Sequence, residues 1–232
     1  MSYIFAPPAV TALAVANSSD QIAVRRVYCV GRNYAAHARE MGSDPTREDP
    51  FFFCKPADGV VPIADSETGT LPYPSLTKNF HHEVELVVVI GKSGSNIAAE
   101  YAIDYVWGYA VGLDMTRRDL QGQMKDKGKP WEIGKAFDHS APIGAVYPIG
   151  VTGVLTNANI YAQVNGADRQ RSNINQMTWP VPEIISHLSR YFELHPGDLI
   201  MTGTPEGVGP VRIGDLLEAG IDGLGIIRVK VA

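Results

Sequence analysis

The stretch HHEVELVVVI, residues 81–90, is the most strand-like part of the chain. Five aliphatic residues follow its second glutamate, and such a run is typical of a buried strand. Side chains two residues apart on a strand share a face, so Glu83 and Glu85 point the same way, and Val87 and Val89 continue that face. Two neighbouring carboxylates at the start of a buried strand repel each other and lose hydration. A divalent cation would remove both costs; a solvated pair at a strand end is the alternative interpretation.

A second apolar stretch, WGYAVGLDM at 107–115, carries Asp114 near its end. A lone aspartate at such a place is more often the cap of a following helix. If the two strands end side by side, however, the carboxylates form a site of hard oxygen ligands, which suits Mg²⁺ or Mn²⁺ better than Zn²⁺. A zinc site would need His81 or His82, and it is disfavoured because Leu86 stands where the H-E-x-x-H pattern requires its second histidine.

A candidate acid–base pair lies nearer the N-terminus. A short helix is expected at 33–42, with Asn33 as its cap. His37 and Glu40 lie three residues apart and therefore face the same side of it. A carboxylate that orients an imidazole makes the imidazole a general base, although most pairs at this spacing are surface pairs. Because loops are expected on both sides, 43–50 among them, this helix could close over a site as a lid.

Further polar residues lie close to these elements. A helix is expected after Thr116, its cap, and Arg118 and Gln121 share one face of that helix. Two lysines accompany aromatic sequence: Lys55 follows the strand FFFC, and Lys135 lies in WEIGKAFD. These groups could meet the carboxylates if the elements pack together.

The rest of the pattern favours a β-rich α+β fold. Strands outnumber helices and do not alternate regularly with them, which argues against a doubly wound sheet. Residues 1–24 are expected to form an N-terminal arm or short hairpin, and 25–232 a single domain. The other expected elements are strands at 26–30, 51–55, 154–164, 199–202 and 224–231, a hairpin turn at 165–166 and a helix at 182–192.

Composition excludes several classes of protein. The chain has 232 residues, 45% of them hydrophobic, and a formal net charge of −5, which is globular and mildly acidic. Nucleic-acid binding, and with it a nuclease or phosphatase, would need a basic surface that this balance does not supply. The segment TGTPEGVG at 202–209 matches neither a Walker A nor a dinucleotide motif. The apolar runs are too short to span a membrane, and two cysteines, Cys29 and Cys54, both in apolar sequence, fit a reducing cytoplasm.

At the level of whole motifs, the chain resembles the fumarylacetoacetate hydrolase family, in particular its small single-domain acylpyruvate and fumarylpyruvate hydrolases. The resemblance runs from about Arg26 to the C-terminus. It rests on VGRNYAAHAREMG, FFFCKP, HHEVEL, GLDMTRRDLQ, KGKPWEIGKAFD, VNGADRQ and LIMTGTPEGVGP, which occur in the family's order. It implies a mixed β-sandwich roll, a homodimer, and Mg²⁺ or Mn²⁺ held by Glu83, Glu85 and Asp114.

The resemblance also implies roles for individual residues. It makes His37 and Glu40 a water-activating pair on a mobile lid and Lys135 the lysine of the site. Arg118 and Gln121 match a pair that contacts substrate. Thr204 matches the threonine whose turn holds the substrate carboxylate, and Lys55 aligns with a further site lysine. Cys54 is a local departure, because relatives usually carry an aliphatic residue there.

The implied substrate is a 2,4-diketo acid whose C3–C4 bond is hydrolysed. Within the family the sequence favours fumarylpyruvate, cleaved to fumarate and pyruvate at the end of gentisate-type aromatic catabolism. Arg32 and Lys78 are candidates for the far carboxylate of that dianion. A general acylpyruvate hydrolase or an oxaloacetate decarboxylase is the second possibility, and a non-catalytic protein that binds a diacid is the third. The presence of both His37 and Glu40 speaks against the last, because a binding protein needs no acid–base pair.

Overall fold

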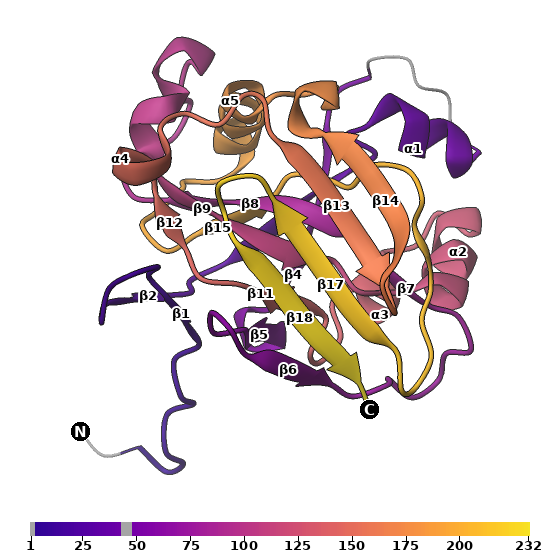
Figure 1. Cartoon of the computed structure of the whole chain (residues 1–232). Helices are drawn as coiled ribbons and strands as arrows, with labels where there is room; N and C mark the ends of the chain where they lie inside the picture. Colours follow the sequence, from indigo (N-terminus) through magenta and orange to yellow (C-terminus); the bar gives the residue numbers. More distant parts are fainter. Residues whose placement is uncertain (1–2, 43–47) are drawn as a thin grey trace.

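The computed structural model describes residues 3–42 and 48–232, and its main feature is two β-sheets packed face to face (Figure 1). Within the described residues the larger sheet has eight strands, in the order β4-β3-β15-β8-β9-β11-β5 with β12 beside β9. Their bounds are β3 (Val27–Gly31), β4 (Phe51–Lys55), β5 (Val60–Pro62), β8 (Val84–Ile90), β9 (Val106–Leu113), β11 (Ala141–Ile143), β12 (Tyr147–Pro148) and β15 (Leu199–Met201).

The second sheet lies across the first and has the order β14-β13-β17-β18-β6. Its strands are β6 (Thr68–Leu71), β13 (Asn159–Val164), β14 (Ala167–Asn173), β17 (Leu216–Ile221) and β18 (Ile226–Val231). A smaller sheet, β10-β7-β16, and a hairpin, β1-β2, complete the strands of the described chain. Their bounds are β1 (Ala12–Ala14), β2 (Gln21–Ala23), β7 (Phe80–His82), β10 (Thr116–Arg117) and β16 (Gly209–Pro210).

Strand β8 forms the centre of the core because both of its faces are covered. Leu86 and Val88 belong to the apolar layer between the two large sheets, which also holds Ile160 of β13 and Leu217 of β17. Val87 belongs to a second apolar cluster on the opposite face of the larger sheet. Every residue of β8 is buried, as the unbroken aliphatic run predicts.

The helices lie around the edges of these sheets. Two of them, α1 and α2, lie near one another on the right side of Figure 1, while α5 packs at the top. The bounds of the helices are α1 (Ala35–Glu40), α2 (Arg118–Asp126), α3 (Glu132–Lys135), α4 (Ile149–Thr152) and α5 (Val181–Tyr191), with 3₁₀ turns at Ala57–Gly59, Ala99–Tyr105 and Ile174–Gln176.

The predicted β-rich α+β class is confirmed, and so is the hairpin turn, since Asn165 and Gly166 both have positive φ angles (53° and 78°) between β13 and β14. The strands expected at 154–164 and 224–231 begin later, at Asn159 and Ile226. The predicted arm contains the hairpin of β1 and β2, in which Leu13 is fully buried against the larger sheet. Of the loop expected at 43–50, residues 43–47 lie outside the described part of the chain.

Both predicted helix caps are wrong. Helix α1 starts after Tyr34, and the Asn33 side chain instead donates to the carbonyl oxygens of Trp179 and Thr202. Helix α2 starts after Arg117, while Thr116 lies in β10 and its hydroxyl donates to Asp114 O and Glu83 Oε1. In each case the side chain bonds to a segment that is distant in the chain rather than closing a helix end.

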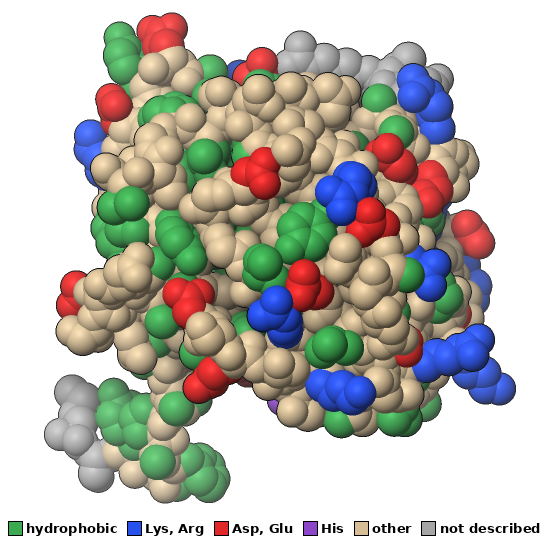
Figure 2. All heavy atoms as spheres, viewed as in Figure 1, with side chains coloured by type: hydrophobic (Ala, Val, Ile, Leu, Met, Phe, Trp, Pro, Cys, Tyr) green, Lys and Arg blue, Asp and Glu red, His purple; other side chains and the backbone are tan. Residues whose placement is uncertain are grey.

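On the face seen in Figure 2 acidic and basic side chains are interspersed, so neither sign of charge predominates there. Cys54 is exposed although its neighbours in the sequence are apolar, while Cys29 is buried. Within the described residues, no helix is long and apolar enough to cross a membrane.

Candidate active site

The candidate site is built on the pairing of β8 with β9. In this antiparallel pair Val84 lies opposite Leu113, and the Asp114 N–H donates to the Glu83 carbonyl at 2.8 Å. Glu83 and Asp114 therefore stand directly across from each other, a placement that brings side chains on the same face about 5 Å apart. Glu85 lies two residues further along that face.

Glu85 is held by the turn that follows β15. The Gly203 N–H donates to Glu85 Oε2 at 2.7 Å. Gly203 has a φ of +94°, and a Cβ atom there would lie 2.7 Å from Asn33 Cβ, so only glycine lets this backbone approach. The turn thus supplies a fixed hydrogen-bond donor at the base of the pocket.

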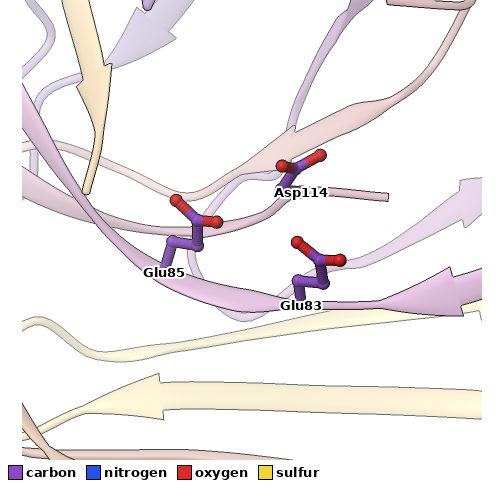
Figure 3. Close-up of side chains that lie close together, drawn as sticks. All are labelled: Glu83, Glu85 and Asp114. Atoms are coloured by element: carbon purple, nitrogen blue, oxygen red, sulfur yellow. The ribbon is translucent and has the colours of Figure 1, made fainter. Parts of the chain in front are cut away.

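The three carboxylates converge, as Figure 3 shows. One ligand atom from each of Glu83, Glu85 and Asp114 lies within 4.8 Å of the others, and all three residues are buried. Burial, together with the charges of Asp114 and Glu83, raises the pKa of Glu85 well above its usual value. Such a cluster of buried oxygen donors is what Mg²⁺ or Mn²⁺ requires, and a divalent cation would offset the repulsion that raises this pKa.

Cationic side chains surround the carboxylates. Lys135 Nζ lies 2.8 Å from Glu83 Oε2 and 2.7 Å from Asp114 Oδ2, and Arg118 pairs with Glu83 Oε1. Burial opposes ionisation of Glu83, but Lys135 and Arg118 outweigh burial and lower the pKa of this carboxyl group. Burial likewise favours a neutral Lys135, and the charges of Asp114 and Glu83 outweigh it to raise the pKa of the amine.

Lys55 lies behind Asp114 rather than in the pocket. Its amine is 2.8 Å from Asp114 Oδ1 and also donates to the carbonyl oxygens of Met115 and Lys135. Its side chain is fully buried. The position fits a support for Asp114 and does not favour the predicted contact with substrate.

Helices α2 and α3 form one wall of the pocket. Arg118 and Gln121 share a face as predicted, and Arg118 Nη1 donates to Gln121 Oε1 at 3.2 Å. A Cβ atom at Gly134 would lie 2.7 Å from the backbone of Gln121, so glycine is what allows α3 to pack this closely. This packing places Lys135 and Gln121 in the lining of one pocket.

The predicted acid–base pair is present on α1. His37 Nδ1 lies 3.2 Å from Glu40 Oε2, with the His37 side chain 8% exposed and the Glu40 side chain 35% exposed. His37 lines the same pocket as the carboxylates. Glu40 also accepts from the Gly207 N–H at 3.1 Å, which joins α1 to the loop after β15.

Thr204 lines the pocket, and a residue that the sequence did not reveal holds it. The Thr204 hydroxyl donates to Val84 O and accepts from Gln170 Nε2, each at 2.8 Å. Gln170 is fully buried, and its Oε1 accepts from Val84 N–H at 3.0 Å. Its motif, VNGADRQ, indicated a hairpin and contributed to the family resemblance, but no role for Gln170, because nothing local shows where an amide side chain on β14 will point.

Of the two cations predicted for the far carboxylate of the substrate, one lines the pocket and the other does not. Arg32 lines the pocket, with its guanidinium 5.9 Å from the centre of the Phe51 ring. Lys78 is exposed and is not among the lining residues, because its backbone N–H is held by Asp119 outside the pocket. Lys125 of α2 lines the pocket instead. Its spacing of seven residues from Arg118 was the signal that could have identified it.

The zinc alternative finds no support in the geometry. His81 Nε2 lies 2.9 Å from Asn79 Oδ1, and His82 Nδ1 lies 3.1 Å from Gln170 Oε1. Neither histidine belongs to the one cluster of potential metal ligands among the residues described. Both histidines lie in β7, directly before Glu83, and pack beside the carboxylates without joining them.

Comparison with known proteins gives consistent results. The model of the fumarylacetoacetate hydrolase C-terminal family matches residues 26–232. A fumarylpyruvate hydrolase of Pseudomonas aeruginosa, solved with Mn²⁺ and pyruvate, is 60% identical with a TM-score of 0.98, covering 100% of this chain and 99% of that one. A putative fumarylpyruvate hydrolase of Burkholderia cenocepacia is 45% identical with a TM-score of 0.92, at the same coverage. A mitochondrial oxaloacetate decarboxylase of Dictyostelium discoideum is 44% identical over 86% of this chain and 90% of its own length.

Proposed function

Because the chain belongs to the fumarylacetoacetate hydrolase family, we propose that it is a metal-dependent enzyme that hydrolyses the C3–C4 bond of fumarylpyruvate. The observation that carries the proposal is the convergence of a buried Glu–Glu–Asp cluster and a His–Glu pair on one pocket. The name of the 60% identical Pseudomonas aeruginosa enzyme and its complex with Mn²⁺ and pyruvate support it. The products would be fumarate and pyruvate.

Glu83, Glu85 and Asp114 would hold Mg²⁺ or Mn²⁺. When bound, such an ion supplies a Lewis acid that stabilises negative charge developing on the substrate's oxygens. Lys135 lies within 2.8 Å of two of these carboxylates, and its charge helps to keep Glu83 ionised, which is the form a metal requires. Lys55 lies behind Asp114, with its amine 2.8 Å from Asp114 Oδ1, and holds this carboxylate in place.

His37 would act as the general base. With Glu40 3.2 Å from its Nδ1, the imidazole can donate there and present Nε2 to a water molecule. The resulting hydroxide attacks the C4 carbonyl, and the C3–C4 bond then breaks with its electron pair passing to C3. The fragment that leaves is the enolate of pyruvate, which takes a proton at C3, and the other fragment is the carboxylic acid.

Four groups of the pocket would bind and polarise the substrate. Lys135 and Gln121 lie where they can stabilise the oxyanion formed at C4, and Arg118 can hold an anionic oxygen beside Glu83. The Thr204 hydroxyl is already committed to Val84 O. The Thr204 turn would therefore bind the substrate carboxylate through backbone N–H groups rather than through the hydroxyl.

Oxaloacetate decarboxylation is the second candidate, and the 44% identity to the Dictyostelium enzyme supports it. Loss of CO₂ from oxaloacetate gives the same pyruvate enolate without a water nucleophile. This reaction therefore needs the carboxylate cluster but not the His37–Glu40 pair.

A His37→Ala variant tests the proposed role of the pair. We expect it to keep its affinity for Mn²⁺, measured by calorimetry, and to lose about 100-fold or more in kcat for fumarylpyruvate. Undiminished fumarylpyruvate turnover would exclude His37 as the base. Loss of metal binding would instead place His37 in the metal site, and a wild-type protein that binds substrate without turnover would be a binding protein.

We further propose, on the family resemblance, that the protein is a cytoplasmic homodimer acting in aromatic catabolism. Light scattering of the purified protein tests the dimer directly: we expect a mass near twice 25.1 kDa. A mass near that of one chain would contradict it.

A further inference from the structure

Helix α2 presents one row of polar side chains to the pocket. Arg118, Gln121 and Lys125 all line it, and their spacing of three and four residues places them along one helix face. At a rise of about 1.5 Å per residue, Lys125 lies about 10 Å further along the helix axis than Arg118. Since Arg118 pairs with Glu83, the row begins at the carboxylate cluster and ends at a lysine.

Lys125 differs from the other cations of this row and its surroundings. Arg118 pairs with Glu83, and Lys135 pairs with both Glu83 and Asp114. Lys125 makes no ion pair within residues 3–42 and 48–232; its amine donates to Met41 O, the residue after α1, at 3.2 Å. An ammonium group has three donors, so this contact leaves capacity for an anion.

We propose that Lys125 binds the far carboxylate of a dianionic substrate and thereby makes the enzyme selective for fumarylpyruvate over acylpyruvates that lack a second carboxylate. The inference rests on the proposed function and adds the residue that selects a substrate with a second negative charge. From C–C bonds of about 1.5 Å, the two carboxyl carbons of extended fumarylpyruvate lie about 8 Å apart. That length matches the row from Arg118 to Lys125, so one end can lie at the cluster while the other reaches the lysine.

The competing cation is Arg32, and its surroundings favour a different part of the surface. Its guanidinium lies 5.9 Å from the Phe51 ring centre. Arg32 also lines a neighbouring cavity with Phe51, Trp131 and Trp179. Lys125 lines the carboxylate pocket and not this neighbouring cavity.

The contact with Met41 gives Lys125 a place next to the acid–base pair. Met41 directly follows Glu40 at the end of α1. A carboxylate bound at Lys125 would therefore lie beside the end of the helix that carries His37. The far end of the substrate and the catalytic helix would share one anchoring group.

The test compares two substrates on a Lys125→Met variant. Fumarylpyruvate is a dianion, whereas acetylpyruvate ends in a methyl group and is a monoanion. We expect kcat/KM for fumarylpyruvate to fall about 10- to 100-fold, the worth of a hydrogen bond to a charged group, with acetylpyruvate changed by less than about threefold. If acetylpyruvate turns over too slowly for kcat/KM to be measured, its inhibition constant in the hydrolysis of fumarylpyruvate is compared between the wild type and the variant instead.

Three controls separate the possible causes. Lys127→Met removes an exposed lysine of the same region and should leave both substrates unchanged. Equal losses on both substrates in Lys125→Met would overturn the proposal and leave Lys125 as a support for α1. A selective loss in Arg32→Met instead would move the role to Arg32. If the wild-type protein hydrolyses acetylpyruvate but not fumarylpyruvate, the proposed substrate itself is wrong.

Discussion

Replacing Glu85 with glutamine separates a metal site from a merely structural acid cluster. The amide keeps the shape of the side chain and can still accept from the Gly203 N–H. It removes the ionisable group from a cluster in which one oxygen of each carboxylate lies within 4.8 Å of the others, so the folded protein no longer has to hold a third charge or a proton there. Without metal, therefore, the substitution should stabilise the protein, whereas removing a hydrogen-bonded structural acid would destabilise it.

The size of the effect follows from the geometry. Two unit charges at 4.8 Å repel by about 3.5 kcal/mol at an effective dielectric constant of about 20. Attraction between Glu85 and Lys135 offsets part of this, so we expect a gain of about 1–3 kcal/mol for the metal-free variant. For a chain of this length that is a rise in Tm of about 2–12 °C.

Metal should reverse the order of stability. At a Mn²⁺ concentration of about 100 times Kd, the wild-type protein gains about 2.7 kcal/mol. Its Tm should rise by about 5–10 °C, while that of Glu85→Gln should rise little. The assay is thermal unfolding of both proteins with EDTA and with Mn²⁺.

The pH dependence gives an internal check on the same pair of proteins. The folded-state pKa of Glu85 is raised, so the folded state binds more protons than the unfolded chain. The stability contribution of this group in metal-free protein should therefore increase as the pH falls from 7 towards the unfolded pKa, and Glu85→Gln should lack that component. A metal-free variant less stable than wild type at pH 7, with an undiminished response to Mn²⁺, would rule out Glu85 as a metal ligand.

The remaining predictions concern residues around the cluster. Gln170→Leu leaves the Val84 N–H without its buried acceptor and the Thr204 hydroxyl without the donor from Gln170, and denaturant unfolding should show a loss of about 2–4 kcal/mol. Glu40→Gln should lower kcat for fumarylpyruvate by about 100-fold or more while calorimetry shows unchanged Mn²⁺ affinity; equal kcat would remove Glu40 from the mechanism. Burial, with Arg118 nearby, lowers the pKa of His81 to about 4, so metal-free protein should lose stability as the pH falls from about 6.5 to 4. In His81→Gln that loss should be smaller, and an identical pH profile would contradict it.

The sequence was sufficient where one periodic pattern governs the structure. Successive side chains of a strand point to opposite faces, so Glu83 and Glu85 share one face, and a one-residue shift in register would turn both carboxylates to the other face of the sheet. The position of Asp114 opposite Glu83 needs only that the two apolar strands pair. The carboxylate cluster is thus carried by β8 and β9, the most regular part of the fold.

Prediction failed where a side chain serves a distant element. Asn33 and Thr116 have the residue types of helix caps, but their hydrogen bonds reach segments far away in the chain. Gln170 contacts Val84 and Thr204 only because β14 folds across the larger sheet. Nothing in the local sequence distinguishes such residues from ordinary caps and hairpin residues.

The prediction of Lys78 as a pocket residue failed for the same reason. Lys78 is near the carboxylate motif in sequence, but it lies outside the pocket on the surface. Lys125 is further away in sequence and reaches the pocket because α2 carries it there on the same face as Arg118 and Gln121. Helical spacing, and not proximity in sequence, therefore indicates which of the two lysines lines the pocket.

Pyruvate release with Mg²⁺, compared between fumarylpyruvate and oxaloacetate for wild type and Glu83→Ala, tests the metal-dependent hydrolase most directly. Pyruvate is quantified by a coupled assay. We expect fast release from fumarylpyruvate by the wild type and none above background by the variant. Release from oxaloacetate alone would move the function to decarboxylation. Undiminished release by Glu83→Ala, or none from fumarylpyruvate by metal-loaded wild type, would contradict a hydrolase that depends on this carboxylate cluster.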